Sequence, residues 1–97
     1  MSRKQDYERK MAAQLREWQA KIDLLKARAE KAGAEQKIAY HEQIENLRAH
    51  QRKARDRFEE LRDAGEDAWD QLVDGLESAG SELKDALRRA GEKLRDV

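Results

Sequence analysis

The last third of the chain repeats every eleven residues, and this repeat restricts the fold more than any other feature of the sequence. Blocks begin at Glu59, Asp70 and Ser81, and a partial fourth block begins at Glu92. One position of the repeat is always leucine, at Leu61, Leu72, Leu83 and Leu94. Eleven residues make three helical turns, so these leucines share one stripe of a helix that needs little supercoiling. The repeat predicts an amphipathic helix.

Apolar residues in the first two thirds follow the alternating spacing of three and four that marks a coiled-coil seam. The first part of this seam comprises Tyr7, Met11, Leu15, Trp18, Ile22, Leu25, Ala29 and Ala32. The second part comprises Tyr40, Ile44, Leu47, Gln51, Ala54, Phe58 and Leu61. The two patterns predict an all-α fold in one domain, with a heptad-patterned segment at 1–64 and the eleven-residue repeat at 65–97.

The segment around Gly33 interrupts the seam, because Gln36 takes a seam position there and the spacing becomes four and four. Such a stutter locally unwinds a coiled coil. The neighbouring residues include no Pro, Asn, Asp or Ser to build or cap a turn. We therefore expect one long helix, from about Ser2 to Asp63, that continues through Gly33 at a cost of about 1 kcal/mol.

A turn is expected at Gly65, where glycine suits the position after a helix end and Asp67 can cap the next helix. A second helix, from about Asp67 to Asp96, would then fold back on the first as a long helical hairpin or coiled coil. The eleven-residue phase runs through Gly65 without a break, which favours an uninterrupted helix instead. The alternative architecture is a three-helix bundle with turns near Gly33 and Gly65, which divide the chain into near-equal thirds.

The charges balance, with 21 basic and 21 acidic residues, so no overall field draws the chain to nucleic acid. Basic residues concentrate at 48–57, and this run has three interpretations: a solvated face, a contact with an acidic helix, or nucleic-acid binding without interleaved aromatic residues. Acidic residues concentrate at 66–77. Folding back at Gly65 would place Asp74 beside Arg55 and Glu77 beside Arg52.

Chemistry-bearing residues are scarce. The chain has no cysteine, which excludes disulfides and thiolate chemistry. Only His41 and His50 are histidines, whereas a metal site usually draws three or four ligands together. Adjacent acids such as Glu59 and Glu60 diverge on a helix and cannot face one substrate. We expect no enzyme, cofactor or metal and, since no signal peptide or apolar span is evident, a cytoplasmic location.

Contact with other proteins is the expected mode of action, because the N-terminal seam of a hairpin would lack a cover. The sequence predicts a homo-oligomer, or a complex with a protein partner, through the residues Met11, Leu15, Trp18, Ile22 and Leu25. The repeat helix adds the interface residues Trp69, Leu72, Leu76, Leu83 and Leu87. The alternative function is binding to a lipid or membrane surface, which eleven-residue amphipathic repeats suit, although the polar face here is acidic.

The segments AWDQL and ELKDAL in the C-terminal part, following a heptad-patterned N-terminal half, are the most distinctive of the chain. With them the sequence resembles a family of small bacterial coiled-coil proteins of unassigned function. It is more loosely similar to apolipoprotein repeats and to stress-associated amphipathic helical proteins. The resemblance implies a cytosolic, helical, non-enzymatic protein with a link to stress, and it brings no functional residues.

Overall fold

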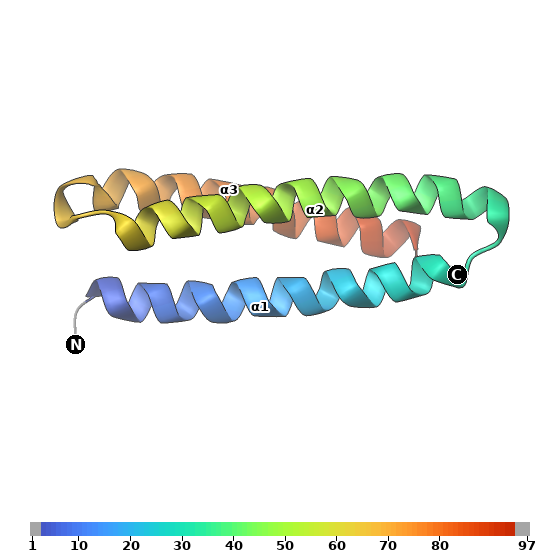
Figure 1. Ribbon diagram of the computed structural model, residues 1–97, viewed down its shortest axis with the longest axis horizontal. Helices are drawn as coiled ribbons and strands as arrows, with labels where there is room; N and C mark the ends of the chain where they lie inside the picture. Colours follow the sequence, from blue (N-terminus) through green and yellow to red (C-terminus); the bar gives the residue numbers. More distant parts are fainter. Residues whose placement is uncertain (1–2, 95–97) are drawn as a thin grey trace.

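The computed structural model describes residues 3–94, and they form three α-helices. The helices are α1 (Arg3–Glu30), α2 (Ala34–Asp63) and α3 (Glu66–Lys93). They lie side by side as an elongated bundle of 51 × 20 × 17 Å, in which α1 and α3 run parallel and α2 runs antiparallel to both (Figure 1). The predicted all-α fold is confirmed.

The turn at Gly33 corrects the expectation of one helix from about Ser2 to Asp63. The first helix ends at Glu30 and the second begins at Ala34, as in the alternative three-helix bundle. Gly33 has an extended backbone (φ −64°, ψ 161°) and forms the N-cap without a side-chain hydrogen bond. Folding at this point buries the α1 seam against α2 and α3, and each buried large apolar side chain stabilises the fold by about 1.5–3 kcal/mol. This burial outweighs the missing cap.

The turn at Gly65 is as predicted, since α2 ends at Asp63 and α3 begins at Glu66. Gly65 itself is the N-cap of α3 and makes no side-chain bond, so the expectation that Asp67 caps this helix is wrong. Asp67 instead lies in the first turn, where a negative charge favours the helix dipole. The predicted outer ends, Ser2 and Asp96, lie outside the described residues.

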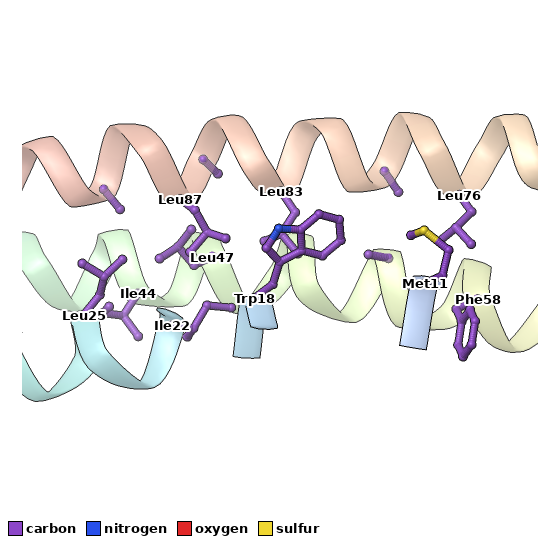
Figure 2. Close-up of a cluster of buried hydrophobic side chains, with 14 of the residues drawn as sticks. Met11, Trp18, Ile22, Leu25, Ile44, Leu47, Phe58, Leu76, Leu83 and Leu87 are labelled. Atoms are coloured by element: carbon purple, nitrogen blue, oxygen red, sulfur yellow. The ribbon is translucent and has the colours of Figure 1, made fainter. Parts of the chain in front are cut away.

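One apolar core runs the length of the bundle, with side chains from all three helices (Figure 2). Its largest fully buried side chains are Ile22, Leu47, Leu61, Leu76, Leu83 and Leu94. Three of the four repeat leucines are therefore fully buried, and the fourth, Leu72, packs partly buried against the core. The stripe predicted from the eleven-residue repeat faces inward, although Leu61 belongs to α2 and the other three to α3.

Among residues 3–94, a single polar residue is buried with these apolar side chains. Gln51 on α2 is 7% exposed, and its side-chain amide donates a hydrogen bond to the Gln19 side chain on α1. The Gln19 amide in turn donates to the Asp23 carboxylate at 2.9 Å. This chain of hydrogen bonds satisfies an amide whose burial without a partner would cost about 1–3 kcal/mol.

The Gly33 turn leads to a prediction with a clear sign. Proline prefers a φ near −65°, the φ of Gly33 is −64°, and a Cβ there would meet nothing within 4 Å. Gly33→Pro should therefore stabilise the protein by about 0.4–1 kcal/mol, because proline restricts the unfolded chain. Urea unfolding followed by circular dichroism measures this change.

The matched control is Ala49→Pro, at an exposed position inside α2. A proline there should cost about 3 kcal/mol. A loss of the same size at Gly33 would mean that the helix continues through that residue, contrary to the structure.

Candidate interaction surface

A groove of about 920 Å³ runs between α1 and α3 along one face of the bundle. It exists because α1 packs less extensively against α3 than against α2. The core residues Trp18, Leu25 and Leu87 reach its floor, and Leu24, which is 55% exposed, lies on its edge. The bundle therefore offers an apolar strip between two parallel helices.

The wall formed by α3 includes a glycine in close contact with the Trp18 indole. A Cβ built at Gly80 would lie 3.0 Å from Trp18 Cη2, which is closer than side chains normally approach. Gly80 therefore lets the indole of α1 lie directly against the α3 backbone, and Figure 2 shows this ring beside Leu83 of α3. The contact fixes the level at which α1 and α3 meet.

The residues predicted as an interface lie in and against the core of the single chain. Those that are buried are Met11, Trp18, Ile22, Leu25, Leu76, Leu83 and Leu87. Those that pack partly buried against the core are Leu15, Trp69 and Leu72. They bring the three helices of one chain together, so the premise that the α1 seam lacks a cover is wrong.

The groove is bordered on α1 by a row of mostly polar residues that sequence reasoning missed. The row follows the core seam at the same spacing of three and four and comprises Lys10, Gln14, Glu17, Lys21 and Leu24. Glu17 and Lys21 form an ion pair within the helix, at 3.9 Å between Oε1 and Nζ. The regular spacing of charged residues next to the seam could have identified this row from the sequence.

A matching row borders the groove on α3, and this wall carries charges of both signs. The groove-lining residues that keep this spacing are Glu77, Ser81, Lys84, Arg88 and Gly91, and Asp85 lines the groove next to Lys84. The same spacing extends the row backward to the exposed residues Asp74 and Asp70. The N-terminal half of this wall is thus acidic, whereas its C-terminal half combines Lys84 and Arg88 with Asp85.

An aromatic pair closes the groove near the N-terminal ends of α1 and α3. The rings of Tyr7 and Trp69 meet edge to face, with centroids 5.5 Å apart and planes at 79°. The Tyr7 hydroxyl donates to Glu77 Oε1 at 3.4 Å, whereas the buried Trp69 Nε1 has no hydrogen-bond partner within residues 3–94. Burial first, and then the carboxylates of Glu77 and Asp74, raise the pKa of Tyr7 to about 12.

The raised pKa predicts that Tyr7 makes the folded state less stable as the pH rises above 10. A free tyrosine has a pKa of about 10, so between pH 10 and 12 the unfolded chain releases this proton while the folded chain retains it. The free energy of unfolding therefore falls with rising pH. Because solvent screens this partly exposed group, we expect a loss of about 1 kcal/mol.

Urea unfolding of the wild type and of Tyr7→Phe at several pH values between about 9 and 12 isolates this contribution. All other ionisable groups are common to the two proteins, so only the difference between the two pH profiles counts. Identical profiles would show that the Tyr7 hydroxyl has the same pKa in the folded and unfolded states.

The basic run of α2 meets α3 through different partners from those predicted. Glu82 Oε2 lies 3.4 Å from Lys53 Nζ and 4.0 Å from His50 Nδ1. The predicted pairs of Asp74 with Arg55 and Glu77 with Arg52 are wrong, because α3 presents Asp74 and Glu77 to Tyr7 of α1. The partner helix is α3, but the contacting acid lies farther along it.

Two arginines of this run pair within their own helix. Arg48 Nη1 lies 3.7 Å from Glu45 Oε1, and Arg57 Nη1 lies 3.3 Å from Glu60 Oε2. All four of these side chains are two-fifths to half exposed. The run therefore combines a solvated face with one contact to α3.

A second, smaller groove of about 480 Å³ lies between the end of α1 and the start of α2. It contains Ile38, which is 70% exposed, and His41, whose Nε2 lies 4.0 Å from Glu45 Oε1. Charged residues of both helices border it as well, including Lys26 and Glu30 of α1 and Glu42 of α2.

Within the described part of the chain, no group of three or more histidine or carboxylate side chains is placed to hold a metal ion. None of the three helices combines the length and the apolar character needed to cross a bilayer. Comparison of the chain with protein-family models, curated protein sequences and solved structures gives no significant match.

Proposed function

We propose that this protein is a non-enzymatic helical protein that acts by binding a helical surface, of a partner or of a second copy, in the groove between α1 and α3. The observation that carries this proposal is the apolar floor of Trp18, Leu25 and Leu87 between two rows of charged residues. Coiled coils use the same arrangement, in which apolar positions supply binding energy and flanking charges select the partner.

The geometry of the groove supports a helical occupant over a small molecule. Two parallel helices form its walls, and it extends along α1 from Tyr7 to Leu25 and along α3 from Glu77 to Gly91. Helices pack into such surfaces as the further members of a bundle or as amphipathic helices in a groove. Gly91 adds no side chain to the α3 wall, and a Cβ there would meet nothing within 4 Å, so a further helix has room to approach at that point.

A photo-reactive amino acid placed at Leu24 tests the proposal in the cells that make the protein. The matched control is the same amino acid at Arg52, which is exposed on α2. Irradiation should give adducts of defined mass from position 24 and few from position 52. Equal yields from the two positions would remove the groove as the interaction surface.

The alternative, binding to a lipid surface, requires α3 to leave the bundle, because its apolar stripe is buried in the core. Liposome flotation combined with Trp69 fluorescence distinguishes the two functions. We expect no flotation and no blue shift with zwitterionic or anionic vesicles. Flotation together with a blue shift would favour the lipid function.

A further inference from the structure

We infer that the chain has a second state, a domain-swapped dimer, in which the turn at Gly33 straightens into helix and two copies exchange their α1 helices. In this dimer the α1 helix of each copy lies on α2 and α3 of the other. The inference goes beyond the proposed function and does not depend on it, because each groove between α1 and α3 is kept and is then formed by two chains.

The place that α1 vacates has an occupant that the structure itself selects. The α1 helix of a second copy brings the same Trp18 to Gly80 and the same Gln19 to Gln51. Exchange of an identical element therefore repeats the core of the single chain and needs no new complementary surface. The turn between α1 and α2 decides whether the exchange occurs.

The apolar seams of α1 and α2 fall on one stripe when the turn becomes helical. Ala29 is the last buried residue of the α1 seam, and the partly buried Tyr40 is the first seam residue of α2. They are eleven residues apart, which is three turns of helix. A hairpin needs no such phase, because its loop only has to reverse the chain. A straight helix through Gly33 would keep one continuous seam.

This seam also reverses onto itself about the point between Ala34 and Glu35, next to the turn. The reversal exchanges Met11 with Phe58, Leu15 with Ala54, Trp18 with Gln51, Ile22 with Leu47, Leu25 with Ile44 and Ala29 with Tyr40. Gln51 bonds to Gln19, the neighbour of Trp18, so α1 and α2 of one chain already pack in this register. Two straightened chains can therefore lie antiparallel about a two-fold axis at this point and keep that register.

Little in the turn itself opposes straightening. Gly33 has neither a positive φ nor a side-chain cap. The other residues of the segment 26–37 are all Ala, Lys, Arg, Glu or Gln, which favour helix. The closed turn also leaves the last C=O groups of α1 and the first N–H groups of α2 without partners inside a helix. A helix through Gly33 pairs these groups.

The turn at Gly65 has the same phase but is held more firmly. Leu61 and Leu72 are eleven residues apart, yet Lys4 Nζ donates a hydrogen bond to the Ala64 carbonyl oxygen at 2.6 Å. In addition, α3 packs more extensively against α2 than α1 packs against either helix. Helix α1 is therefore the element that exchanges.

New contacts form only where the two straightened segments 30–37 cross. The residues on the seam there are uncharged, namely Ala32, Gly33 and Gln36. Of the four charged residues, Lys31 and Glu35 point away from the partner and become i, i+4 neighbours in one helix. Glu30 and Lys37 flank the seam, and each Lys37 lies about 3 Å along the axis from the partner's Glu30, against about 7.5 Å from the partner's Lys37.

Opposite substitutions at Gly33 test the exchange, by sedimentation equilibrium after refolding from urea. A Cβ at this position meets nothing within 4 Å, so the turn can close in both variants. Gly33→Ala favours a helix through the turn and should raise the dimer association constant at least about tenfold, since both chains contain the turn. Gly33→Pro breaks that helix and should lower the constant by at least as much. The control Gly75→Ala gains helix propensity away from the turn and should leave the constant unchanged.

A distance within one chain shows whether the dimer is exchanged. Arg16 and Arg55 are exposed and border the same small groove between α1 and α2, so they are close in the closed chain. On one straight helix they would be about 60 Å apart. Arg16→Cys with Arg55→Cys carries two spin labels, because the chain has no other cysteine. Refolded with a tenfold excess of unlabelled protein, it should give the short distance in the monomer fraction and the long one in the dimer fraction.

A dimer fraction with only the short distance would overturn the inference. So would equal responses of Gly33→Ala and Gly33→Pro, or a Gly33→Ala protein that stays monomeric after refolding at about 100 µM, where even weak specific dimers are populated. The proposed function fails separately, because cross-linking from Leu24 reports on the groove in the monomer and in the dimer alike.

Discussion

Leu83→Ala is expected to destabilise the bundle by about 2–5 kcal/mol, the range for removing a leucine side chain from a packed core. Leu83 is fully buried on α3 and lies in the core close to Trp18 (Figure 2). Small domains have total stabilities of about 5–15 kcal/mol, so this loss would remove a large part of the stability. Urea unfolding at one fixed protein concentration, followed by circular dichroism, measures the change.

The matched control is Ile38→Ala, which truncates a side chain that is 70% exposed on α2. This substitution should change the free energy of unfolding by less than about 0.5 kcal/mol. Similar losses from the two substitutions would contradict the burial that the structure assigns to α3.

Trp18→Ala is expected to cost about 3–5 kcal/mol, because the indole is 6% exposed and fills the space between α1 and α3. The substitution also frees the space above Gly80, where a Cβ would lie 3.0 Å from the ring. The two positions should therefore depend on each other, and thermal or urea unfolding of the four proteins in a double-mutant cycle measures that dependence.

In the wild type, Gly80→Ala combines overpacking, at about 1–3 kcal/mol, with a gain in helix propensity of about 1 kcal/mol. We expect a net loss of about 1 kcal/mol. In the Trp18→Ala background the same change should instead stabilise by about 1 kcal/mol. Gly75→Ala, whose Cβ would meet Arg57 at an ordinary 3.9 Å, should stabilise both backgrounds equally. Equal effects of Gly80→Ala in the two backgrounds would show that Trp18 does not rest on Gly80.

The core could be predicted almost completely from the spacing of apolar residues. The seam members Met11, Trp18 and Ile22 are all buried, and the polar Gln51 at a seam position is buried as well. Spacing identifies which face of each helix turns inward, because a helix exposes its residues with a fixed period. It does not identify which helix each face meets.

The Gly33 turn could not be predicted from turn-forming residues, because neither glycine turn uses a side-chain cap. The relevant signal was the irregular spacing around Gln36, which marks the place where the seam changes helix. The prediction considered only the local cost of forming a turn near Gly33. The stabilisation that produces the turn comes from the burial of apolar side chains along the whole length of α1. The unbroken eleven-residue spacing from Leu61 to Leu72 likewise did not indicate a continuous helix, since the two leucines lie on different helices.

The two rows of residues that border the groove between α1 and α3 could not be predicted from the sequence for a different reason. The sequence characterised the polar face of the repeat helix only as acidic. The packing of α1 beside α3 shows that Lys84 and Arg88 of that helix border an apolar strip. A helix pair creates such a strip, so no single segment contains it.

The buried amide of Gln51 limits how far α1 can slide along α2. Moving α1 by one heptad in either direction would replace Gln19 by Ala12 or Lys26 opposite that amide, and neither side chain offers it an acceptor. A buried amide without a partner costs about 1–3 kcal/mol, whereas the apolar residues on either side tolerate several alignments. One glutamine pair thus sets the position of α1 along α2. It thereby also sets which charged residues of the separate helices lie at the same height along the bundle.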